Sequence, residues 1–125
     1  MLKISSEVKF GNNVKNVDEW HKTANPWTIT LKNKNKRMTI PFWTGSALGE
    51  PSTFDVLHCL ISDANCVADG FEWFCDSLGY NKDSIKDMRV YKACVANRNK
   101  LQRFLGDEFN NLLGLEEDDI KKYCI

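Results

Sequence analysis

The sequence is short of positive charge over one long stretch, because residues 38–81 contain no lysine or arginine. It also has no apolar run near the roughly 20 residues that cross a bilayer, so we expect no membrane span. The five cysteines include no Cys-x-x-Cys pair, and no secretory leader pattern opens the chain. These absences favour a reduced, cytoplasmic protein.

Sequence patterns of enzymes and metal sites are equally scarce. Residues 45–49 resemble a nucleophile elbow but do not spell Gly-x-Ser-x-Gly. Glu50-Pro51 follows them, where a phosphate loop would need a lysine and a hydroxyl. Zinc could be bound by His58, Cys59 and Cys66, but the closely spaced ligand pair that is typical of structural zinc sites is missing. We therefore predict no catalytic residue, no metal and no cofactor, and keep a thiol or zinc enzyme as a minor alternative.

What the sequence does contain is the composition of one folded domain spanning residues 1–125. It is 42% hydrophobic and 27% charged, which is ordinary for a globular chain of this length. The net charge of zero comes from 17 basic and 17 acidic residues that are unevenly placed. Residues 1–37 carry +5, residues 38–81 carry −6 and residues 82–125 carry +1.

Period-two alternation predicts β-structure in the first third of the chain. Apolar residues alternate with polar ones over 2–10, and a turn follows at 11–13. Residues 18–21 fit one helical turn, ended by Asn25-Pro26. Two further alternating runs around an Asn/Lys loop predict a β-hairpin over 27–43, in which Pro41 indicates an edge strand or an outward-facing amide position.

Helical periodicity takes over after Ser52 and continues to residue 122. Ser52 and Ser84 each precede an aspartate by three residues, which is the spacing of a helix N-cap. Gly79 and Gly106 are placed to end helices. We predict an α+β fold, with a small N-terminal antiparallel sheet packed against a C-terminal helical half at 52–122. The residues expected to face inward include Leu57, Leu60, Ile61, Leu78, Ile85 and Cys59.

A longer pattern of residues runs from 27 to 113. It comprises 27–31, 38–42, 45–47, 49–51, 55–57, 59–60, 62–64, 71–73, 79–80, Tyr91, Leu101 and 104–106. The combined string resembles a family of small, mostly uncharacterised proteins encoded in early regions of tailed-phage genomes and prophages. Residues 47–49 depart from the Thr-Gly form of that family, and the first 26 residues and the tail do not match.

The resemblance implies a phage origin, and small phage proteins without enzymatic motifs often act by binding a host protein. Our leading hypothesis is a non-enzymatic inhibitor of a host defence complex, in the style of anti-CRISPR proteins. An acidic surface would occupy the nucleic-acid channel of a host partner such as a CRISPR nuclease. The candidate partner-binding residues are Glu50, Asp55, Asp63, Asp69, Glu72 and Asp76. The alternative is that the stretch 38–81 covers a buried element plus a few solvated carboxylates, which the lysines neutralise across the fold.

The second hypothesis is a nucleic-acid-binding phage accessory protein. Its candidate residues are Lys32, Lys34, Lys36 and Arg37, at the tip of the predicted hairpin. A basic tip contacts phosphate, although lysines also commonly protect a strand edge from pairing. The sequence leaves the oligomeric state open.

Overall fold

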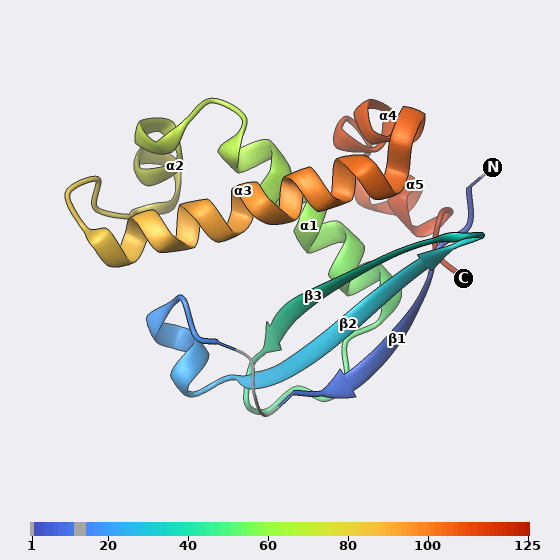
Figure 1. The fold of residues 1–125 in the computed structure, drawn as a ribbon, viewed down its shortest axis with the longest axis horizontal. Coiled ribbons are helices and arrows are strands. Elements are labelled where there is room, and N and C mark those ends of the chain that lie inside the picture. Colours follow the sequence, from blue (N-terminus) through green and yellow to red (C-terminus); the bar gives the residue numbers. More distant parts are fainter. Residues whose placement is uncertain (1, 12–14) are drawn as a thin grey trace.

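A computed structural model describes residues 2–11 and 15–125 (Figure 1). It confirms the predicted α+β fold, with an antiparallel sheet first and a helical half after it. No helix in the described part of the chain is long and apolar enough to cross a membrane. In chain order the elements are β1 Ser5–Phe10, the 3-10 helix η1 Glu19–Lys22, β2 Asn25–Asn33, β3 Lys36–Thr44, α1 Thr53–Val67, α2 Phe71–Leu78, α3 Ile85–Leu105, the 3-10 helix η2 Gly106–Glu108, α4 Phe109–Leu113 and α5 Glu117–Lys121.

The strand boundaries differ from the prediction at two places. Asn25-Pro26 opens β2 and does not end the helical turn, because both residues pair with the end of β3. Regular pairing of β1 begins at Ser5 and not at residue 2. Residues 12 and 13 of the predicted turn lie outside the described residues.

The sheet has the order β1-β2-β3, so β3 is an edge strand. Residues 34–35 form the two-residue hairpin loop, and Lys34 takes a positive φ of 48° there. On β3 the backbone of alternate residues points away from β2, and the Thr39 carbonyl oxygen accepts a hydrogen bond from α3 on that free side. Pro41, two residues on, lies on the same outward side, so its missing N–H costs the sheet nothing.

The predicted helix signals are confirmed as caps. Ser52 Oγ accepts a hydrogen bond from the Asp55 N–H at 3.1 Å, and Asp55 Oδ2 accepts one from the Ser52 N–H at 2.9 Å. Ser84 Oγ accepts a hydrogen bond from the Asp87 N–H at the start of α3. Gly79 ends α2 at a φ of 77°, a left-handed conformation that favours glycine.

The main core lies between one face of the sheet and the helices. The inner face of the hairpin contributes Ile29, Leu31, Met38 and Ile40, and α1 packs Leu57 against them. Leu60, Ile61, Leu101, Phe104, Phe109, Leu112 and Ile120 complete most of this core. A smaller cluster around Val67, Phe74 and Val90 joins α1 and α2 to the first half of α3.

Three residues expected in the core are exposed instead. Ile85 is the first residue of α3 and is 76% exposed, because the helix begins beyond its packing partners. Leu78 is the last residue of α2 and is 47% exposed. Cys59 is exposed because it lies about 200° around α1 from Leu57, which is at the centre of the buried stripe.

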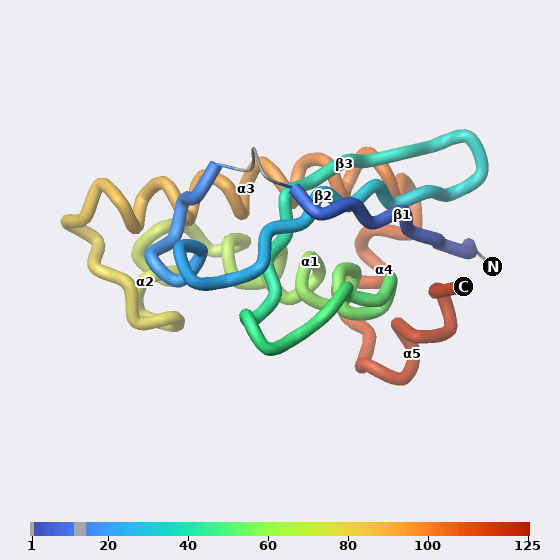
Figure 2. Tube along the Cα trace, turned by 90° about the horizontal axis from the view of Figure 1, so that it is seen from below, coloured from blue at the N-terminus to red at the C-terminus, as the bar shows by residue number. Residues whose placement is uncertain are grey.

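The two ends of the chain lie side by side. The Ile4 N–H donates to the Tyr123 carbonyl oxygen at 2.7 Å, and the Ile125 N–H donates to the Ile4 carbonyl oxygen at 2.9 Å. A parallel bridge between Ile4 and Cys124 results. Figure 2 shows this end of the molecule, with α5 next to the start of the chain.

Candidate anion-binding cleft between strand β3 and helix α3

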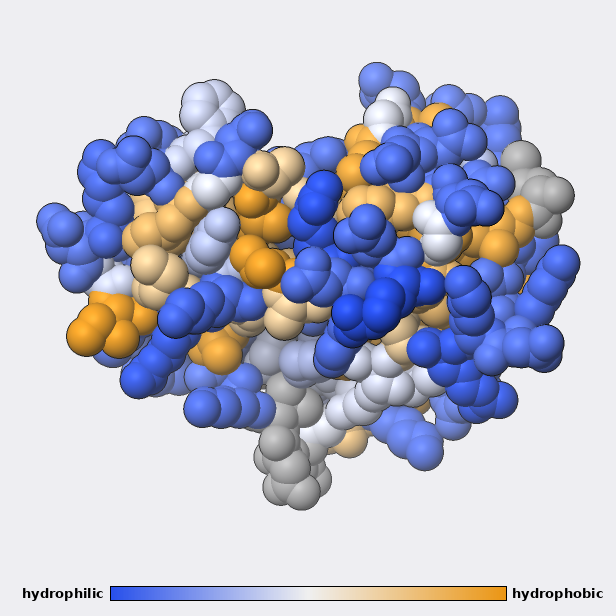
Figure 3. All heavy atoms as spheres, turned by 45° about the horizontal axis from the view of Figure 1, so that its top comes forward, coloured by the Kyte–Doolittle hydropathy of each residue, from blue (hydrophilic) through white to orange (hydrophobic). Residues whose placement is uncertain are grey.

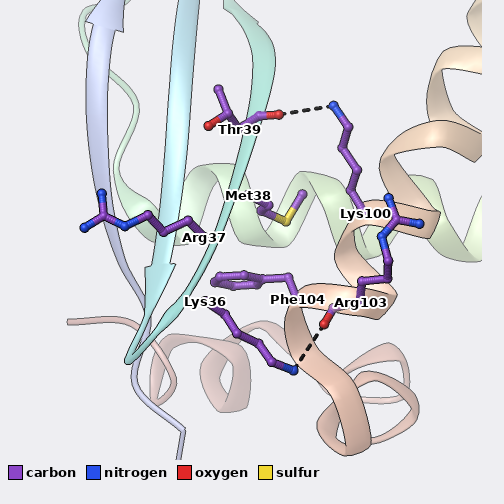
Figure 4. Close-up of a pocket in the computed structure, with 7 residues that line it drawn as sticks. All are labelled: Lys36, Arg37, Met38, Thr39, Lys100, Arg103 and Phe104. Carbon is purple, nitrogen blue, oxygen red and sulfur yellow. Dashed lines mark hydrogen bonds between the residues drawn. The ribbon is translucent and has the colours of Figure 1, made fainter.

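A cleft opens where the free edge of β3 runs past the second half of α3 (Figure 4). Its volume is about 440 Å³. The residues that line it are Lys36, Arg37, Met38, Thr39, Lys100, Arg103 and Phe104. We call it the basic cleft, since four of these seven residues are cationic and none is acidic.

Two lysines are held across the basic cleft by main-chain oxygens. Lys36 Nζ donates to the Arg103 carbonyl oxygen at 3.3 Å, and Lys100 Nζ donates to the Thr39 carbonyl oxygen at 3.2 Å. An ammonium group has three N–H donors, so each lysine keeps donors for a further acceptor. A carbonyl carries no formal charge, and the two positive charges therefore remain uncompensated.

The two arginines flank the cleft on different sides. Arg103 projects from α3 beside Lys100, whereas the Arg37 side chain extends across the outer face of the sheet, away from α3 (Figure 4). Arg37 is opposite Lys32 in the hairpin register. Lys32 is itself ion-paired, because its Nζ lies 2.8 Å from Glu7 Oε2. The hydrogen bond and charge of Lys32, together with the charges of Lys9 and Arg37, hold the pKa of Glu7 below its ordinary value.

The electrostatic balance of the cleft is positive. In the part of the chain that the structure describes, no carboxylate lies within 4.0 Å of Lys36, Arg37, Lys100 or Arg103. The floor is apolar, since Met38 and Phe104 are buried. The site can therefore attract and hold an anion, and its seven lining residues include no histidine, cysteine or carboxylate for proton transfer or nucleophilic attack.

Only two of the four predicted nucleic-acid-binding residues line the basic cleft. Lys36 and Arg37 line the basic cleft. Lys34 is in the hairpin loop, and Lys32 forms an ion pair with Glu7. Sequence reasoning missed Lys100 and Arg103. Their spacing of three places them on one helix face, but the contact with a strand more than sixty residues earlier leaves no local signal.

The predicted acidic residues are spread along α1 and α2. Asp55 is engaged in the Ser52 cap at one end of α1, and Asp69 follows its other end, about 20 Å away along the helix axis. Asp63 is half-buried in the wall of a different pocket. Glu50 is exposed in the loop before α1.

The remaining acidic residues gather on α2. Glu72 and Asp76 are exposed there, one helical turn apart, and Trp73 is 54% exposed beside them. Glu72 Oε1 lies 3.8 Å from Lys82 Nζ. We call Asp69, Glu72, Trp73 and Asp76 the acidic α2 face.

The residues of the zinc alternative do not form a metal site. Among residues 2–11 and 15–125 the structure brings together no group of three or more histidine, cysteine, aspartate or glutamate side chains that would hold a metal ion. His58 Nε2 instead lies 3.4 Å from Glu117 Oε1. Comparison with known proteins adds no relative, because no family model, curated protein or solved structure matches the chain.

Proposed function

We propose that the protein binds nucleic acid through the basic cleft, as an accessory protein without enzymatic activity. The observation that carries the proposal is the convergence of Lys36, Lys100 and Arg103 on one cleft that no acidic residue lines. Phosphates are the anions that such an arrangement of lysine and arginine commonly binds.

The geometry favours backbone contacts over base recognition. A sugar-phosphate strand running along the edge of β3 would meet Arg37 on one side and Lys100 and Arg103 on the other. Phe104 is buried and offers no open stacking platform for a base. The proposal is therefore phosphate binding with little sequence preference.

The test is fluorescence anisotropy of labelled single-stranded and double-stranded oligonucleotides over a range of salt concentrations. Each phosphate contact contributes roughly 0.7–0.9 to the slope of log K against log salt. The double variant Lys100→Gln/Arg103→Gln should therefore bind more weakly, with the slope reduced by about 1.5. Lys82→Gln/Lys121→Gln is the matched control, because it removes the same charge from exposed lysines that do not line the cleft.

Binding that is absent, or that does not depend on salt, would remove the proposal. Equal losses of affinity in the cleft variant and in the control variant would show that binding depends on the overall charge of the protein and not on the basic cleft.

A second candidate function is the inhibition of a host defence complex by protein binding, as the phage-protein resemblance implies. The acidic α2 face favours it, because an exposed tryptophan between two carboxylates suits a basic protein surface. A host partner, such as a CRISPR nuclease, and a cytoplasmic site of action belong to this proposal.

The second candidate is tested by plating a phage that a CRISPR nuclease targets on cells that express the protein. Neutralising the face with Asp69→Asn, Glu72→Gln and Asp76→Asn should abolish protection of the phage. The control triple variant changes three exposed carboxylates at the start of α5, Glu116→Gln, Glu117→Gln and Asp118→Asn. Full protection by a folded α2 variant, or none by the natural sequence, excludes this candidate.

A further inference from the structure

A second hollow lies at the opposite end of β3 from the hairpin loop. Here η1 folds beside the end of β3 and faces α1, α2 and the first half of α3 (Figures 1 and 2). We call this hollow, of about 370 Å³, the η1 pocket. Figure 3 views the molecule with the top of Figure 1 turned forward and shows apolar residues between hydrophilic ones across this face. The pocket shares no lining residue with the basic cleft.

Aromatic rings form one wall of the η1 pocket and are held in place. The rings of His21 and Trp43 stack with centroids 3.5 Å apart and an angle of 5° between their planes. His21 Nδ1 accepts hydrogen bonds from the N–H groups of Val17 and Asp18 at 3.2 and 3.3 Å, which places the ring proton on Nε2. Burial lowers the pKa of His21, so its imidazole is neutral at pH 7.5.

Helix α1 contributes to the pocket lining one carboxylate without a partner. Asp63 of α1 is half-buried, and within the described residues it accepts no hydrogen bond and has no cation within 4.0 Å. Burial raises its pKa to about 6, so Asp63 is mostly ionised at pH 7.5. The pocket lining includes no lysine or arginine in the described part of the chain.

The other titratable groups around Asp63 do not compensate its charge. Cys59 and Cys66 on α1 and Cys94 on α3 have raised pKa values, because their thiol groups are partly desolvated and the negative charge of Asp63 adds to this effect. Asp18, before η1, already accepts the hydrogen bond of the Tyr80 hydroxyl at 2.8 Å. The remaining facing groups are His21, whose Nδ1 accepts two main-chain hydrogen bonds, and His58, which pairs with Glu117.

One polar atom of the aromatic wall also has no partner. The indole Nε1 of Trp43 is buried without a hydrogen-bond partner in the described structure. That N–H is a donor, and a cation cannot accept a hydrogen bond from it. The group that an occupant would complete is therefore the half-buried carboxylate of Asp63, which lacks a donor.

We propose that the η1 pocket binds a small organic cation, with an ammonium, amidinium or guanidinium group against Asp63 and the body of the molecule against the aromatic wall. A cation supplies the charge-assisted hydrogen bonds that Asp63 lacks. Aromatic faces attract cations as well as apolar groups. The volume accommodates a small molecule or a single arginine or lysine side chain of another protein, and these two sources share the same chemistry.

The probe is benzamidine, a planar cation, and its neutral isostere benzamide is the matched ligand control. The readout is the indole N–H signal of each tryptophan in a ¹H–¹⁵N spectrum. At pH 7.5, benzamidine should shift the Trp43 signal saturably and leave that of Trp73, which is outside the pocket, unmoved. Benzamide should shift neither. A second titration uses arginine with blocked amino and carboxyl groups, which represents the side chain of a protein. Tighter binding of this compound than of benzamidine would indicate that the pocket binds an arginine side chain of another protein.

The variant Asp63→Asn keeps the side-chain shape and removes the charge, and it should weaken benzamidine binding at least tenfold. Asp76→Asn, on the exposed face of α2, should leave binding unchanged. Binding by the natural sequence should also weaken about tenfold between pH 7.5 and pH 5, as Asp63 takes up a proton, and the Asp63→Asn variant should lose this dependence. Equal binding of benzamidine and benzamide, no saturable shift of Trp43, or full affinity in Asp63→Asn would each overturn the proposal.

Discussion

The unpaired carboxylate of Asp63 should make the protein less stable as the pH rises. In the folded chain its pKa is raised from 3.8 to about 6 by burial. Below pH 3.8 the group is protonated in both states and has no effect. Between 3.8 and 6 the unfolded chain releases the proton while the folded chain holds it, so stability falls, and above 6 the full penalty applies. A shift of about two pKa units corresponds to about 3 kcal/mol.

The assay compares the natural sequence with Asp63→Asn by urea denaturation at pH values from 4 to 8. All other titrating groups are common to both proteins, so their effects cancel in the difference. The free energy of unfolding of the natural sequence should fall by about 2.5 kcal/mol relative to that of the variant over this range, because part of the full effect is already lost at pH 4. In thermal unfolding at pH 8 this difference corresponds to roughly 10 °C for a chain of this length.

The substitution Asp76→Asn serves as the control, because that carboxylate is exposed on α2. Its difference from the natural sequence should stay flat with pH. A constant difference for Asp63→Asn as well would refute the reasoning, since it would mean that Asp63 is hydrated or paired in solution.

Three substitutions test the fold itself through chemical denaturation. Leu57→Ala removes a side chain with 0% exposure from the main core and should cost about 3 kcal/mol, whereas a loss below about 1 kcal/mol would mean that the core collapses around the gap. Ser52→Ala deletes the α1 cap and should cost about 1 kcal/mol, and an unchanged midpoint would show that water replaces the hydroxyl. Gly79→Ala meets no side chain within 4 Å, so its expected cost of about 1 kcal/mol arises from the positive φ alone; a stabilised variant would contradict that conformation.

Local signals in the sequence were sufficient for the elements of the fold. Ser52, Ser84 and Gly79 act over three or four residues, and their caps can be predicted from spacing. The alternating hairpin was predictable for the same reason, and Pro41 correctly indicated an edge strand.

The sequence did not show which residues at the helix ends are covered by neighbouring elements. Ile85 and Leu78 fit the helical period, yet they lie at helix ends where no neighbour covers them. The basic cleft has the same origin, because Lys36 meets Arg103 through packing between distant segments and not through any motif. Lys100 lies in the segment 82–125, whose net charge is only +1, so the charge distribution along the sequence did not indicate it as a binding residue.

The bridge between the chain ends has a consequence for the order of assembly. Lys3 Nζ and the Lys122 carbonyl oxygen, which are 119 residues apart, make a hydrogen bond at this bridge. Closing a loop of that length costs about 4 kcal/mol of chain entropy, whereas each hydrogen bond returns only about 1 kcal/mol. We therefore expect the bridge to form after the hairpin and the helices have shortened the loop. The last residues then join the N-terminal segment to a domain that is already folded. The register of β1 is set by its pairing with β2 and not by the C-terminal residues.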